Sequence, residues 1–192
     1  AKRVLPYSNQ QTSGTIGGPI VRDRLHFFAT YEYEREPKTF VYAGPYPAFN
    51  MDLSFTNRAH KPLGRVDWQI TPQTRLSSRI SFYNAMFHEG GGATSHPSNM
   101  GQRGRISSQY TGSLTKVISN RSVNEVKGGA TFYERQDQSA TITWKGQRPL
   151  PYHPVLDGGT VLVALRGYSI GVSPLNIIQN TANIRDDFTT SY

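Results

Sequence analysis

The hydrophobic and polar positions of this chain alternate with a period of two over several stretches. The clearest stretch runs from Leu25 to Glu34, where the odd-numbered positions are apolar or aromatic and the even-numbered ones include a histidine and two glutamates. Successive side chains of a β-strand point to opposite faces, so this pattern predicts a strand with one apolar and one polar face.

The same alternation recurs along the chain and predicts an all-β fold. All twelve prolines lie outside the alternating stretches or at the end of one, as Pro19 does, which agrees with the exclusion of proline from ladder interiors. The expected strands cover about 12–20, 25–35, 63–70, 75–88, 104–118, 123–135 and 181–192.

The connections between these strands are alternately short and long. Turns of a few residues are expected at 21–24, 71–74 and 119–122, and long loops at 36–62, 89–103 and 136–180. Outer-membrane barrels have short periplasmic turns and long extracellular loops, and strands of about ten tilted residues cross their apolar band of about 25 Å. The sequence therefore predicts an antiparallel transmembrane β-barrel, of which this chain supplies about seven strands. The apolar positions would face lipid and the polar ones a water-filled lumen.

Composition agrees with this prediction. Only 36% of the chain's 192 residues are hydrophobic, a low fraction for a protein with a soluble core. The chain also has 18 glycines and 12 prolines, which favour turns over helices. It has no run of about 18 apolar residues, which excludes a membrane-spanning helix but not barrel strands. It also has no cysteine, which excludes disulfides, thiolate metal sites and a cysteine nucleophile.

The net charge of +8 suits an anionic partner such as lipopolysaccharide. The basic residues are scattered singly and no recognition motif is present, so we do not expect nucleic-acid binding. His88, Glu89 and His96 match no metal-ligand spacing, and no nucleophile or dinucleotide motif occurs. The sequence therefore predicts no catalytic residue, no cofactor and no metal site.

Charged and polar side chains on the lumen side of the expected strands are the first candidate site. They could line a substrate path or contact a plug, whereas the favoured interpretation is a cross-strand ion ladder that keeps the lumen wet. These residues are Arg65, Asp67, Arg79, Tyr83 and Arg105.

The long loops are the second candidate site, because binding residues concentrate on loops held by a rigid scaffold. Tyr42 and Tyr46 belong to an aromatic, proline-containing loop that is either a ligand platform or packed on itself. The stretch 160–165 of the last loop is either a short strand or a packed loop core. The candidates in that loop, suited to stacking on sugars or binding anionic groups, are Trp144, Arg148, Tyr152 and Arg166.

Three stretches carry a resemblance to a known family. TSGTIGGPIVRDRLHFFATYEYEREP resembles the N-terminal barrel region of TonB-dependent outer-membrane receptors, in particular the Oar-like ones with a carboxypeptidase-regulatory-like domain. LGRVDWQITPQTRLSSRISFY is similar to the next strand pair, and NIRDDFTTSY to a later strand. Ser13 stands where the family usually has a glycine. The resemblance covers most of residues 10–134 and the last dozen.

The resemblance implies a 22-stranded barrel in the bacterial outer membrane that takes up a bulky nutrient, such as a siderophore or an oligosaccharide. It implies outer-membrane lipid, lipopolysaccharide, the protein's own plug domain and the TonB complex as partners. The plug and the TonB-contacting segment are expected outside this chain, which would be a barrel fragment.

Two other functions stay open at this point. The first is a soluble or surface-exposed β-rich module that binds glycans or acts as an adhesin, and it predicts that residues 1–192 fold alone as a soluble species. The second is a barrel with a structural role in the envelope or a role in secretion, in which the loops contact proteins rather than solutes.

Overall fold

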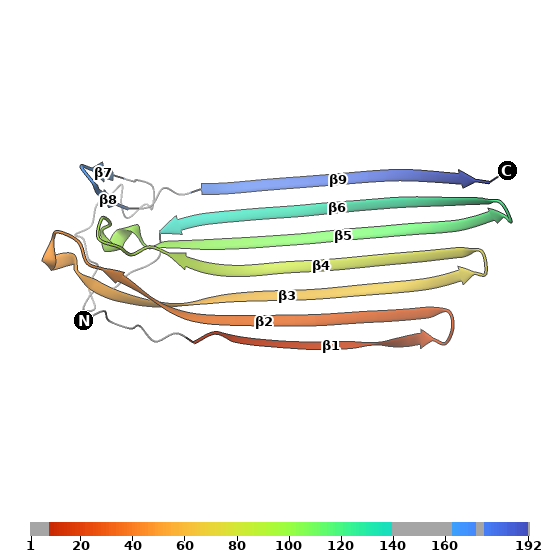
Figure 1. The fold of residues 1–192 in the computed structure, drawn as a ribbon, viewed down its shortest axis with the longest axis horizontal. Coiled ribbons are helices and arrows are strands. Elements are labelled where there is room, and N and C mark those ends of the chain that lie inside the picture. The colour runs from red at the N-terminus through yellow and green to blue at the C-terminus, as the bar shows by residue number, and fades with distance from the viewer. Residues whose placement is uncertain (1–7, 140–162, 172–174, 192) are drawn as a thin grey trace.

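The computed structural model describes residues 8–139, 163–171 and 175–191. Seven strands form one antiparallel sheet in the order β1-β2-β3-β4-β5-β6-β9 (Figure 1). Its strands are β1 (Gln10–Val21), β2 (Leu25–Tyr42), β3 (Met51–Thr71), β4 (Thr74–Glu89), β5 (Gly101–Ser119), β6 (Ser122–Ser139) and β9 (Leu175–Thr190). The smaller elements are the hairpin β7 (Val163–Leu165) and β8 (Tyr168–Ile170) and the 3-10 turns η1 (Pro47–Phe49) and η2 (Pro97–Asn99).

The large sheet is a single layer in which each strand pairs with its neighbours in the chain. β1 and β9 are its two edges, and the described strands do not close into a ring. The all-β class and the seven antiparallel strands that the sequence predicts are thus confirmed. Within the described ranges, no helix has the length and apolar character needed to cross a membrane.

The three short turns lie together at one end of the sheet, on the right in Figure 1, and the connections 43–50 and 90–100 lie at the other, with the β7–β8 hairpin. We call these the turn end and the loop end. In the first turn Asp23 adopts a φ of 60°, and the N–H of Arg24 donates to the carbonyl of Val21 at 3.1 Å. A carboxylate side chain tolerates this left-handed conformation better than most residues do.

The prediction of a long loop at 36–62 is wrong in extent. β2 and β3 pair continuously from Arg35↔Arg58 to Tyr42↔Met51, so that only residues 43–50 connect them. Pro37 and Pro62 suggested the loop, yet neither proline removes a hydrogen bond that a neighbouring strand needs. Pro37 lies beyond the end of β1, which starts at Gln10 opposite Arg35. Pro62 lies where the pairing of β3 with β4 is interrupted.

The two other predicted loops are also shorter than expected, because strand pairing continues past the end of the clear alternation. The loop 89–103 narrows to residues 90–100, and β6 and β9 reach into the predicted loop 136–180. Part of the stretch 160–165 is strand, since β7 begins at Val163.

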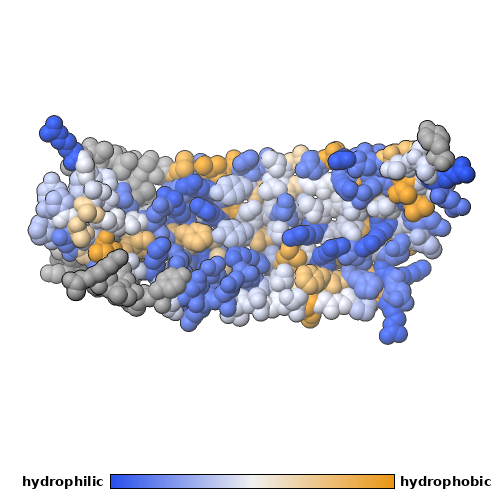
Figure 2. Space-filling view, in the orientation of Figure 1, coloured by the Kyte–Doolittle hydropathy of each residue, from blue (hydrophilic) through white to orange (hydrophobic). Residues whose placement is uncertain are grey.

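The strand register places apolar positions beside apolar positions and polar positions beside polar ones, so the sheet has one apolar and one polar face. One rung on the apolar face crosses all seven strands without a charged residue, and it consists of Ile16, Ala29, Gly64, Ile80, Tyr110, Ala130 and Ala182. The adjacent rung on the polar face consists of Gly17, Phe28, Arg65, Arg79, Thr111, Gly129 and Asn183. Figure 2 looks onto the polar face, where hydrophilic side chains gather over the strands.

The apolar face is exposed rather than packed against a second layer. Trp68 keeps 43% and Phe82 40% of its surface open to solvent. Phe82, Tyr110 and Phe132 form a row of edge-to-face contacts on this face, with ring centroids 6.0 Å apart in each pair. Buried side chains gather instead at the loop end, in a small cluster of Phe40, Tyr42 and Met100 with Leu53 and Phe55 packed against it.

Candidate functional site

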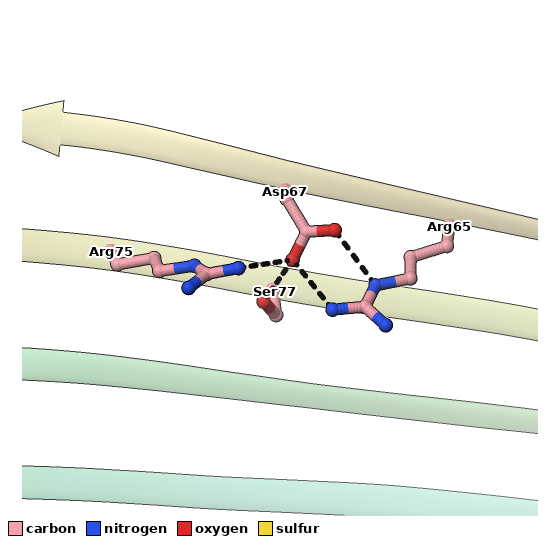
Figure 3. Close-up of polar contacts among 4 residues, drawn as sticks. All are labelled: Arg65, Asp67, Arg75 and Ser77. Atoms are coloured by element: carbon pink, nitrogen blue, oxygen red, sulfur yellow. Dashed lines mark hydrogen bonds and ion pairs between the residues drawn. The ribbon is translucent and has the colours of Figure 1, made fainter. Parts of the chain in front are cut away.

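Asp67 is the centre of a polar network near the turn end (Figure 3). Its two carboxylate oxygens accept hydrogen bonds from Nε and Nη2 of Arg65 at 2.7 and 3.0 Å. Arg75 donates to Oδ1 at 3.2 Å, and the hydroxyl of Ser77 donates to the same atom. The carboxylate is therefore fully engaged, and we assign it a structural rather than a catalytic role.

Ion pairs between residues two apart on one strand recur across the polar face. Arg135 contacts Asp137 at 2.5 Å, and Arg185 contacts Asp187 at 2.7 Å. Cross-strand ion pairs of the expected kind are also present, at Lys61 with Glu32 and Glu34, at Arg75 with Asp67 and at Arg103 with Glu89 and Asp137. Alternation places residues i and i+2 on the same face, so the Arg-x-Asp spacing was the signal for the pairs within one strand.

The five residues predicted on the lumen side all lie on the polar face. Arg65 and Asp67 are paired, and Arg79 lies directly opposite Arg65 in the register of β3 with β4. Tyr83 is half-buried opposite Ser107 on β5. The guanidinium of Arg105 lies 5.6 Å from the ring centroid of Phe87, and its buried Nε has no hydrogen-bond partner within the described residues.

The predicted loop residues that the structure describes differ in their exposure to solvent. Tyr42 is the last residue of β2 and only 2% exposed, so its ring presents almost no surface to a ligand. Tyr46 is 50% exposed and makes an edge-to-face contact with Tyr168 on β8, with centroids 5.0 Å apart. Arg166 is exposed in the turn between β7 and β8. Trp144, Arg148 and Tyr152 lie outside the described residues.

A junction of loops at the loop end was not foreseen from the sequence. The backbone N–H of His96 donates to the carbonyl of Ser169 at 2.8 Å, and the N–H of Ser169 donates to that of Thr94 at 2.9 Å. The side-chain amide of Asn99 donates to the carbonyl of Gly171 at 2.8 Å. These bonds tie the connection 90–100 to the β7–β8 hairpin, over 70 residues further along the chain.

His96 is the buried centre of this loop junction, with 1% of its surface exposed. Its Nδ1 accepts a hydrogen bond from the backbone N–H of Ser98 at 3.1 Å, and its ring lies edge-on to Phe49 with centroids 4.4 Å apart. Burial lowers the pKa of His96, which favours the neutral imidazole. The only signal in the sequence was a histidine before Pro97, the position of a cap ahead of a helical turn.

His88 and Glu89 take no part in a metal site together with His96. The ring of His88 stacks on Phe55, with centroids 4.4 Å apart, and its backbone N–H donates to the side chain of Asn57 at 2.8 Å. Among the residues that the structure describes, no group of three potential metal ligands occurs.

Comparison of the chain with protein-family models, with curated proteins and with solved structures finds no match. The candidate function therefore depends on the two-faced sheet, the polar network and the loop end.

Proposed function

We propose that the chain is part of the barrel wall of a TonB-dependent outer-membrane receptor that takes up a bulky nutrient, such as a siderophore or an oligosaccharide. The observation that carries this proposal is the register, which aligns the apolar rows of seven strands into one exposed face. In a bilayer this face would contact hydrocarbon, while the polar face would line an aqueous channel.

The extent of the apolar face supports the proposal. On β4 it runs from Leu76 to Phe82 and gives way to Asn84, which pairs with His60 and Ile106. The eight residue-to-residue steps from Leu76 to Asn84 cover about 27 Å along the strand. Allowing for strand tilt, this length accounts for most of an apolar band about 25 Å tall.

The two ends of the sheet support an orientation. In the proposed barrel the three short turns would face the periplasm, and the longer connections would face the cell exterior. Further strands would pair with the free edges of β1 and β9, because open sheet edges are costly in a membrane. Ligand contact is proposed at the loop end, where Tyr46 and Arg166 are exposed.

The exposed Tyr46 beside Tyr168 is also compatible with the alternative of a soluble or surface-exposed glycan-binding module, because aromatic rings stack on sugars. That alternative needs a cover for the apolar face that the described residues do not supply. A barrel with a structural or secretory role would share the same wall and differ only in what its loops contact.

Adjacent positions of opposite parity give a sharp test in the full-length protein. Single cysteines at Ile80→Cys and Ser81→Cys would be spin-labelled after reconstitution into lipid vesicles. The label at position 80 should be accessible to oxygen dissolved in lipid and the label at position 81 to a water-soluble nickel complex. Equal access of both labels to the nickel complex, or recovery of the native protein without detergent in the soluble fraction, would overturn the proposal.

The growth of a deletion strain distinguishes nutrient uptake from a structural role of the barrel. A strain lacking the gene should grow poorly on one defined iron or carbon source and normally on others if the barrel imports a nutrient. Envelope leakage on every source, without a nutrient-specific defect, would favour the structural barrel.

A further inference from the structure

A groove of about 390 Å³ opens on the polar face in the middle of the sheet. Small residues from β5 and β6, such as Thr111, Ser113 and Gly129, line it. Longer polar side chains also line it, namely Arg65, Arg79, Gln109, Lys127 and Asn183.

Two of the three cations in this groove already have an acidic partner. Arg65 is paired with Asp67 at 2.7 Å, and Lys127 with Glu125 at 2.7 Å. Arg79 has no acidic partner among the residues that the structure describes. The positions two before and two after it on β4 are serines rather than acids.

The surroundings of Arg79 favour an added anion. It lies opposite Arg65 on one side and Thr111 on the other. Like charges that lie directly opposite each other destabilise a strand pair. The carboxylate of Asp67 cannot offset this repulsion fully, because it is already shared between Arg65 and Arg75. A guanidinium offers five donors in a planar fork that matches a carboxylate.

We propose that this groove is a carboxylate-binding subsite in which Arg79 holds the carboxylate and the amides of Gln109 and Asn183 supply further donors. The inference rests on the proposed function, because it requires the polar face to border an aqueous channel. The carboxylate belongs either to a solute in the channel or to a polypeptide segment that occupies it, and the experiment distinguishes these two sources.

The test measures how fast each arginine of the full-length protein in detergent reacts with phenylglyoxal, with citrate as the solute probe and mass spectrometry as the readout. Arg121, exposed in the β5–β6 turn, is the free reference. If the protein itself supplies the carboxylate, Arg79 should react about tenfold more slowly than Arg121 without citrate. If a solute supplies it, Arg79 should match Arg121 until citrate slows Arg79 alone, in a saturable manner.

Steric shielding gives a different result from charge pairing. About 1 M NaCl should restore the reaction of a shielded Arg79 if a carboxylate holds it, since salt screens exposed ion pairs. A slow rate unchanged by salt would overturn the inference. So would a rate equal to that of Arg121 both with and without citrate.

Thr111 offers a matched pair of variants, because it lies opposite Arg79. Thr111→Glu should supply a carboxylate within the sheet, slow the reaction of Arg79 and abolish any effect of citrate, whereas Thr111→Gln should not. Where Arg79 of the unaltered protein matches Arg121 without citrate, equal behaviour of the two variants would contradict the inference. Membrane location and the label accessibility at positions 80 and 81 are measured separately, so a failed subsite leaves the proposed barrel standing.

Discussion

Asp67 accepts two hydrogen bonds from Arg65, its neighbour two residues earlier on β3, and a third from Arg75 across the strand pair. The three residues form one unit, since the two cations share a single carboxylate. A charge-assisted contact of this geometry is stronger than an isolated surface ion pair.

Asp67→Asn should therefore lower the free energy of unfolding by about 1 to 2 kcal/mol, because it removes the carboxylate from two arginines. Urea titration of the full-length protein in lipid vesicles measures this change. The matched control is Asp187→Asn on the edge strand β9, whose partner Arg185 is far more exposed, and its effect should be smaller. Equal losses in the two variants would contradict a special role for Asp67.

The loop junction around His96 should weaken in acid. Burial holds the pKa of His96 below its ordinary value of 6.5, so protonation favours the open or unfolded state. The contribution of neutral His96 to the stability of the loop junction is complete above about pH 6.5. It is lost as the pH falls through the lower pKa that His96 has in the folded state. Hydrogen exchange at the amides of Ser98 and Ser169, corrected for intrinsic rates, should show protection at pH 7.5 that declines toward pH 5.

His96→Asn is the control for this prediction, because asparagine offers an acceptor but does not titrate. His88 also has a pKa lowered by burial, so His88→Asn is measured in parallel. Persistence of the acid-induced loss in His96→Asn would show that another group controls the junction.

Gly90 is required for the packing of the loop-end cluster. A Cβ at this position would collide with the hydroxyl of Tyr42 and come within 3.2 Å of Cα of Met100. Gly90→Ala should destabilise the protein by about 1 to 3 kcal/mol through overpacking, as measured by denaturant titration. Gly18→Ala, whose Cβ meets nothing within 4 Å, should cost less. Adding Tyr42→Phe should recover part of the loss, and no recovery would place the strain elsewhere.

The apolar face gives a direct prediction of the proposed barrel. Ile80→Lys should destabilise the protein in lipid vesicles by about 2 to 4 kcal/mol, because a lysine on the lipid face of a barrel loses its hydration. Ser81→Lys, on the polar face, should have a much smaller effect. Similar unfolding free energies for both variants would count against a bilayer on one side of the sheet.

The sequence by itself determined which positions share a face and where the chain turns back. Alternation is a local property of a strand, so it identified the two faces, the three short turns and the polar-face placement of Arg65 and Arg79. Proline was misleading at Pro37 and Pro62, because its effect depends on whether a neighbouring strand needs that N–H.

Only the tertiary structure decided how the rows meet. Register between strands selects the opposite neighbour of each residue, and it left Arg79 beside Arg65 rather than beside an acid. The loop junction joins His96 to Ser169 across a long span of sequence, and no local pattern encodes that contact. The physical reason is that alternation depends on the geometry of one strand, whereas pairing and packing depend on segments that meet only after the chain has folded.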